Sequence, residues 1–536
     1  MRKRLEASQT KTLLALIGAV LVVGALLWEP ITHFDTHVWG PEYPWTHRDF
    51  LGAYWLFWAA PDVSEKLSLT QWPQGGLPLL HHIPNPFDAL LLGPLLFPND
   101  PDQIAVRFPF WWNLLQLGHH IGNVTATVLL ARTIRCGAVS SWLAGCLVAA
   151  SPIMLHEIAG GRTLSGAVWP GLLSLMYLLR GHSFRSGAAL CLQCLSYLYT
   201  GLVFALIAVI LWVGGQQRPR RMWRFWLGLS PLIVYLLWLW PRITETGAPP
   251  PAGFTALPMS GMLGLNLVPE RFRLHPALWL GLLALLPWCH VRIHKEIDTR
   301  WLLLGAGTAT FIALGPTPTW AMEPTTLSSP MQWVMQTFPG LARMHHPVRA
   351  AMVGVPLLAI ITVAVLEIRP RILQPLMVLL LIPMAKSTEL ATSWTQEGQP
   401  PGVTASEWLR ANGSGVVDLT GDHGAALGLQ PVHGLPMLEG LRRSRGPTRD
   451  GSSTLRRQAD GWLRNETQPG LAQQLVNAGF SHLLFIPRPG EASVDTTALE
   501  ADLGPPIFPY VYALSQTKLE TSPPPPSQEQ EAETHE

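Results

Sequence analysis

The stretch MRKRLEASQTKTLLALIGAVLVVGALLWEP, residues 1–30, decides the class of protein to which this chain belongs. Three basic residues follow the first methionine, and an uninterrupted apolar run then extends over residues 12–28. A helix needs roughly 20 apolar residues to cross a bilayer, and this run approaches that length. It ends in Trp28, Glu29 and Pro30 rather than in small residues suited to cleavage. We therefore expect a retained membrane anchor with its N-terminus in the cytoplasm.

The composition of the whole chain extends this interpretation. Of 536 residues, 48% are hydrophobic and 13% are charged, and the charged share is about half that of soluble domains. A net charge of +2 provides no broad positive field, so nucleic acid is not expected as a partner. The five cysteines lie in or beside apolar segments, which argues against a disulfide framework.

Further apolar runs predict an all-α polytopic membrane domain of about eleven transmembrane helices over residues 1–387. Besides the run 186–214, the expected spans lie near residues 12–28, 108–132, 138–156, 163–180, 223–240, 274–292, 300–315, 348–367 and 371–386.

The run 186–214 is too long for one span. A break near 196–201 turns it into a hairpin of two short spans, and one continuous helix is the alternative. With the break, most basic loop residues fall on the side of the N-terminus, as the positive-inside rule requires, and the C-terminus lies outside. The expected location is a bacterial inner membrane, with the C-terminus periplasmic.

Two polar regions are then expected on the outer side. The first is the loop 29–106, which contains an amphipathic aromatic piece over 50–60. The second is a small α/β module over 388–515. Residues 516–536 are rich in glutamate and follow a run of prolines, a composition that predicts a disordered tail.

Within the module, four elements are predicted. Helices are expected over 405–411 and 471–478, and short buried strands over 415–419 and 482–486.

The first outer loop concentrates ionisable residues and offers candidate catalytic acids. A carboxylate there could deprotonate an acceptor hydroxyl, which requires one acid within hydrogen-bond reach of the nucleophile. Asp49 is the preferred candidate because it directly precedes the aromatic piece 50–60, and Asp35 is the second. The alternative is that Asp49 only caps that segment as a helix.

A metal site in the same loop is the weaker hypothesis. His33 and His37 stand four residues apart around Asp35 and could share a metal on a helix, but the nearby prolines make a continuous helix doubtful. Cys191 and Cys194 have the spacing of a zinc or redox pair, yet they lie in an apolar span without a second pair. No metal or other cofactor is therefore expected, and a divalent ion is the alternative.

The segment 339–349, PGLARMHHPVR, places cations directly before a predicted span. Arg343 and Arg349 can meet phosphoryl oxygens in bidentate geometry, and His345 and His346 add imidazoles at the depth of phosphate headgroups. A lipid-phosphate donor would fit these four residues. Generic anchoring to membrane lipid headgroups explains them equally well.

Three stretches resemble the GT-C superfamily of polytopic glycosyltransferases, specifically bacterial relatives of dolichyl-phosphate-mannose-type mannosyltransferases. They are HRDFLGAYWLFW at 47–58, the segment 339–349, where a histidine stands in place of a usual arginine, and the outer module. The resemblance implies a polyprenyl-phosphate sugar donor, an inverting transfer on the outer face and a first-loop acid as base.

The rival class is a non-enzymatic membrane protein, either a lipid or polysaccharide translocator or an assembly factor. A transporter should carry charged or broken-helix residues at mid-membrane. The predicted spans are nearly free of charge, which favours an interfacial site, whereas the break near 196–201 keeps the transporter reading open. Protein partners cannot be inferred from these patterns.

Overall fold

The structure of the chain is a computed structural model. It describes residues 2–34, 37–39, 54, 55, 58, 101–159, 166–214, 222–245, 300–320, 323–324, 329, 332–333, 347–367, 391–393, 402–419, 429–430, 432–438, 452–462, 464–486 and 495–514. The expected spans 274–292 and 371–386 and the tail 516–536 lie outside these residues.

The chain divides into two compact units. The first comprises residues 1–67, 77–400 and 444–446, and the second comprises 68–76, 401–443 and 447–536.

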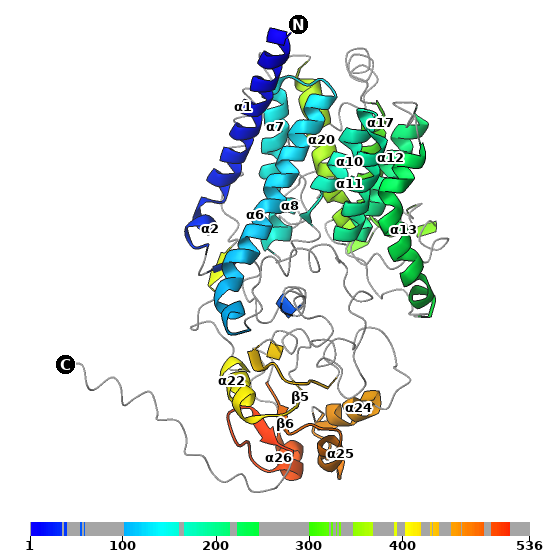
Figure 1. Cartoon of the computed structure of the whole chain (residues 1–536). Coiled ribbons are helices and arrows are strands. Elements are labelled where there is room, and N and C mark those ends of the chain that lie inside the picture. Colours follow the sequence, from blue (N-terminus) through cyan, green and yellow to red (C-terminus); the bar gives the residue numbers. More distant parts are fainter. Residues whose placement is uncertain are drawn as a thin grey trace, which may run out of the picture. The chain divides into compact units, whose positions relative to one another are not determined.

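The first unit is a bundle of helices (Figure 1), and its described strands form two short antiparallel pairs, β1 with β4 and β2 with β3. Its described helices are α1 (Arg2–Leu26), α2 (Trp28–Thr32), α6 (Pro101–Thr133), α7 (Ala138–Ala149), α8 (Pro152–Ala159), α10 (Trp169–Leu179), α11 (Ser183–Ser196), α12 (Leu198–Val213), α13 (Met222–Glu245), α17 (Arg300–Ala313), the 3-10 turn η7 (Pro347–Arg349) and α20 (Ala350–Leu366). Its strands are β1 (His37–Trp39), β2 (Thr319–Trp320), β3 (Glu323–Pro324) and β4 (Ala391–Ser393).

The apolar character of this bundle matches a membrane environment. Within the described residues, Gln9–Leu26 and Pro347–Val365 are long and apolar enough to cross a membrane, and five shorter helices are also apolar. Large apolar side chains are exposed along several helices, among them Leu21 on α1, Val213 on α12 and Val234 on α13. Exposed apolar surface of this extent is stable against lipid and unfavourable against water.

One expected span is interrupted. The run 138–156 was predicted as a single helix, but α7 ends at Ala149 and α8 begins at Pro152. Proline disfavours helical backbone at the residue before it and has no N–H for a hydrogen bond to the preceding turn. The interruption sets Glu157 on a short separate helix.

The predicted break in the run 186–214 is confirmed. Helix α11 ends at Ser196, Tyr197 is extended at φ −155° and ψ 106°, and α12 begins at Leu198. A Cβ placed on Gly201 would lie 2.7 Å from the Cα of Cys194, a proximity that one straight helix does not allow.

The directions of α11 and α13 support a hairpin at this break. Gly187 of α11 packs against Phe225 of α13, and Cys191 interacts further along with the Leu232 backbone. The two helices therefore run in the same direction, so the chain must return between them, and α12 provides that return.

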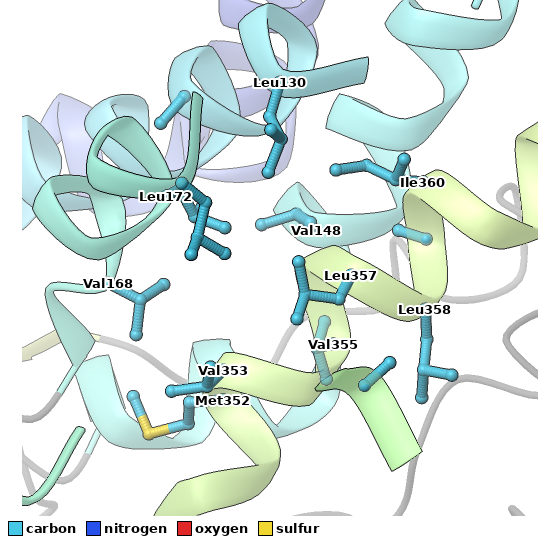
Figure 2. Packing of buried hydrophobic residues seen from close by; sticks show 14 of the residues in the cluster. Leu130, Val148, Val168, Leu172, Met352, Val353, Val355, Leu357, Leu358 and Ile360 are labelled. Atoms are coloured by element: carbon cyan, nitrogen blue, oxygen red, sulfur yellow. The ribbon is translucent and has the colours of Figure 1, made fainter. Parts of the chain in front are cut away.

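The core of the bundle joins segments far apart in the sequence. Figure 2 shows Leu130 of α6, Val148 of α7, Leu172 of α10 and Leu357 of α20 converging on one apolar cluster. Because α6, α7, α10 and α20 share this cluster, the segments at their ends are held in fixed positions around it.

Hydrogen bonds show which connecting segments lie at the same end of the bundle. At one end, Arg132 donates to the Thr12 hydroxyl, Arg180 donates to the Thr133 hydroxyl, and the Gly137 N–H donates to Glu367. These residues all belong to segments expected on the cytoplasmic side. Glu367 follows the end of α20, so Arg349, at the start of α20, lies at the opposite end of the bundle.

The second unit is a small α/β fold. Its helices and strands are α22 (Gly402–Asn412), β5 (Val416–Asp418), α24 (Ser452–Trp462), α25 (Leu471–Asn477), β6 (His482–Leu484), α26 (Thr497–Leu503) and β7 (Val511–Ala513). Strand β6 is central, parallel to β5 and antiparallel to β7, and it aligns Val417, Leu483 and Tyr512 in the core. The four elements predicted over 405–411, 415–419, 471–478 and 482–486 are confirmed.

Candidate functional site

The predicted site residues fall into two groups. Asp35, Asp49, Arg343, His345 and His346 lie outside the described residues. Arg349 is described, at the start of the segment 347–367.

Arg349 ends the turn η7 and is the residue before α20. Its Nε atom lies 3.5 Å from Oε2 of Glu157, and the two side chains are 12% and 6% exposed. Its Nη1 atom donates a 2.5 Å hydrogen bond to the Tyr197 hydroxyl, and the guanidinium carbon lies 5.4 Å from the centre of that ring. The arginine is therefore held by a carboxylate, a hydroxyl and an aromatic face.

Glu157 was not among the residues predicted from the sequence. It lies on α8 and is 5% exposed, which is rare for a glutamate unless it is paired. A carboxylate beside a histidine in the otherwise apolar run IMLHEIA, at 153–159, was the signal that could have identified it.

Tyr197 owes its position to the break between α11 and α12. Its backbone N–H donates to Gln193, and its carbonyl accepts from the Gly201 N–H and the Thr200 hydroxyl. The buried Gln193 amide in turn donates to Thr200 and to the Ala167 carbonyl. This network fixes the tyrosine ring beside Arg349.

A buried asparagine fixes the segment next to Glu157. Oδ1 of Asn123 accepts from the Val168 and Trp169 N–H groups, and Nδ2 donates to the Gly166 carbonyl at 2.6 Å. A Cβ placed on Gly166 would lie 3.9 Å from the Cβ of Glu157, so the segment that Asn123 anchors packs against α8.

Asn123 belongs to a polar row on α6 that the sequence analysis did not single out. The buried members of the row recur at helical spacing and are Asn113, Gln116, His119, His120, Asn123 and Thr127. His119 accepts from the Trp169 indole, and Nε2 of His120 lies 3.1 Å from the Ala149 carbonyl. Each of these contacts ties α6 to the segments around α8 and α10.

The first loop begins at the same end of the bundle as Arg349. Asn113 of α6 accepts from the Trp39 N–H and donates to the Phe34 and His37 carbonyls, which places β1 at the end of α6 remote from Arg132. Strand β1 pairs antiparallel with β4, with His37 opposite Ser393. Two segments therefore lie at one end of the bundle. One is the start of the loop that contains Asp35 and Asp49, and the other follows the last expected span.

The two first-loop histidines are neighbours. The rings of His33 and His37 lie 4.8 Å apart, and burial and the nearby His33 lower the pKa of His37. Among the residues that the structure describes, no group of three or more histidine, cysteine, aspartate or glutamate side chains could hold a metal ion. Cys191 and Cys194 are both buried, as expected for packing residues.

Chemically, the cluster of Glu157, Tyr197 and Arg349 is a candidate anion site. A guanidinium held in a largely dry position attracts an anion more strongly than one in water. An aromatic hydroxyl and a carboxylate restrict its orientation. These features suit a phosphoryl group that arrives from the end of the bundle.

No family model and no curated protein matches this chain. Among solved structures, arabinofuranosyltransferase AftD from mycobacteria is similar over 88% of this chain and 35% of its own, with 14% identity and a TM-score of 0.47. The Archaeoglobus fulgidus oligosaccharyltransferase, in complex with zinc and sulfate, is similar over 88% of this chain and 67% of its own, with 12% identity and a TM-score of 0.47. This chain spans about a third of the length of the mycobacterial protein.

Both similar proteins are glycosyltransferases, the class that the sequence resemblance predicts. With TM-scores below 0.5, these likenesses decide neither the fold nor the activity of this chain.

Proposed function

We propose that this chain is a GT-C-type membrane glycosyltransferase that moves a sugar from a polyprenyl-phosphate donor to an acceptor on the outer face of a bacterial inner membrane. The proposal assigns the donor phosphate to Arg343, His345, His346 and Arg349. It assigns the acceptor's proton to Asp49, with Asp35 as the second candidate.

The observation that carries the proposal is the position of Arg349. Its guanidinium is mostly buried at the end of a helical bundle, beside Tyr197 and opposite the end formed by Thr12 and Gly137. The first-loop strand β1 lies at the same end as Arg349. An acid from the first loop and a cation before α20 could thus act on one substrate.

The proposed chemistry needs one proton transfer and one stabilised leaving group. Asp49 takes the proton of the acceptor hydroxyl as its oxygen attacks the sugar carbon. The arginines and histidines stabilise the negative charge that grows on the departing lipid phosphate. The proposed reaction uses no cofactor.

Asp49→Asn tests the assignment of the base. Loss of general-base assistance costs about 10² to 10⁴ in rate, so transfer from a radiolabelled polyprenyl-phosphate sugar should fall by that factor in purified protein. Expression and thermal unfolding should match the wild type. Transfer at the wild-type rate would remove Asp49 as the base, and Asp35→Asn would be measured next.

The alternative, a translocator or assembly factor, keeps one specific observation in its favour. The buried polar row on α6 includes His119 and His120, and polar or ionisable residues inside a membrane bundle are typical of transport paths. Reconstituted vesicles separate the two functions. A translocator moves a lipid-linked sugar across the bilayer chemically unchanged, whereas a transferase releases polyprenyl phosphate.

A further inference from the structure

The Arg349 guanidinium already has an anionic neighbour. The Glu157 carboxylate lies 3.5 Å away, and both side chains are largely buried. We propose that Glu157 is a built-in counter-ion, which occupies Arg349 while the site is empty and gives way to the donor phosphate. This inference rests on the proposed function, in which Arg349 binds that phosphate.

The geometry of the pair favours exchange. A strong arginine–carboxylate pair has N–O distances of about 2.7 to 2.9 Å and is often bidentate, whereas Nε of Arg349 lies 3.5 Å from Oε2 of Glu157. A phosphate oxygen that approaches at the shorter distance therefore gains more than the carboxylate loses. A buried guanidinium without any anion would be costly, which explains why a counter-ion is present.

Tyr197 keeps Arg349 in place during the exchange. The 2.5 Å hydrogen bond to its hydroxyl and the contact with its ring do not involve Glu157. The tyrosine backbone is fixed by Gln193 and Gly201 on either side of the helix break. The arginine can therefore change its anion without changing its position.

The position of Glu157 argues against a role as the catalytic base. In an in-line displacement, the attacking hydroxyl and the departing phosphate lie on opposite sides of the sugar carbon. A carboxylate paired with a cation for the phosphate lies on the leaving-group side. Glu157 is thus a positioning residue that acts through Arg349, and the base remains in the first loop.

The test is phosphate binding by Glu157→Gln in the full-length protein in detergent. The variant without ligand should unfold at a lower temperature than the wild type because Arg349 loses the Glu157 carboxylate. It should bind farnesyl phosphate about tenfold more tightly, which corresponds to about 1.4 kcal/mol. Tyr197→Phe is the matched control, since it removes one contact of Arg349 without a change in charge and should not tighten binding. In Glu157→Gln/Arg349→Gln, the gain should disappear.

The possible results separate the inference from the proposed function. If the wild type binds farnesyl phosphate and Glu157→Gln binds it equally or more weakly, the pair is only structural and the inference fails. If neither protein binds farnesyl phosphate, the proposed donor is wrong and the inference fails with it. An equal gain for farnesol would show that the effect is not ionic and would also overturn the inference.

Two further arms complete the design. Equal gains for inorganic phosphate and farnesyl phosphate would support exchange at Arg349, whereas equal affinities of the wild type for these two ligands would refute a lipid donor. If Glu157→Gln does not fold, Glu157→Asp withdraws the carboxylate by one methylene and should tighten farnesyl phosphate binding by less than tenfold. Weaker binding by Glu157→Asp would refute the exchange.

Discussion

Replacing Asn123 by alanine should loosen the segment that packs against the helix of Glu157. The Asn123 side chain is 2% exposed and makes hydrogen bonds of 2.6, 2.8 and 2.9 Å to Gly166, Trp169 and Val168. In Asn123→Ala, the two N–H groups and one carbonyl lose this partner. Val168 is fully buried, so water does not readily replace the amide at its N–H.

The magnitude follows from those three contacts. A buried donor left without a partner costs about 1 to 3 kcal/mol, whereas side-chain hydrogen bonds in membrane bundles average about 0.6 kcal/mol each. Three bonds at the lower figure give about 2 kcal/mol, and two orphaned donors give up to about 6 kcal/mol. We expect a loss near the lower end because the segment can shift. In a unit of this size, that loss corresponds to a fall in Tm of roughly 2 to 3 °C.

A thiol-reactive dye suits the assay because Cys136, Cys146, Cys191 and Cys194 are buried and become reactive on unfolding. Cys289→Ser in every variant removes the remaining thiol as a source of background. Thr127→Ala is the control, since Thr127 is equally buried and donates only to the Asn123 carbonyl of its own helix. If Asn123→Ala and Thr127→Ala unfold within 1 °C of each other, roughly the assay's resolution, the anchoring role is refuted.

Three other predictions concern packing, pH and orientation. Gly187→Ala should destabilise the bundle by about 1 to 3 kcal/mol because its Cβ would collide with the Phe225 carbonyl oxygen. Gly307→Ala, with open space around its Cβ, should be neutral or stabilising by the same dye assay. Burial lowers the pKa of His433 from 6.5 to about 3, so the unfolded state binds more protons between these values. The second unit should lose up to about 1.4 kcal/mol per pH unit as the pH falls below 6.5. Hydrogen-exchange protection of peptides over 429–438 that stays unchanged between pH 7 and 5, after correction for the intrinsic exchange rate, would contradict this. A C-terminal alkaline phosphatase fusion should be active and a fluorescent-protein fusion dark, and the opposite pair of results would overturn the expected topology.

The sequence by itself determined much of the layout, because hydropathy and turn chemistry act over short distances along the chain. Apolar length indicated the helices that became α1, α6 and α20. The excess length of the run 186–214 indicated a break, and local patterns located β5 and β6. Composition also marked Arg349 as a candidate, since an arginine before a span is informative without any knowledge of its neighbours.

Only the tertiary structure decided which side chains meet. Arg349 and Tyr197 are 152 residues apart, and no local pattern predicts that a helix break would place the tyrosine hydroxyl on that guanidinium. Glu157 was overlooked because Pro152 interrupts the expected span 138–156 and moves the carboxylate into a separate helix. Its role as a partner of Arg349 depends on the packing of α7 and α20 in one core, which fixes both residues at the same end of the bundle.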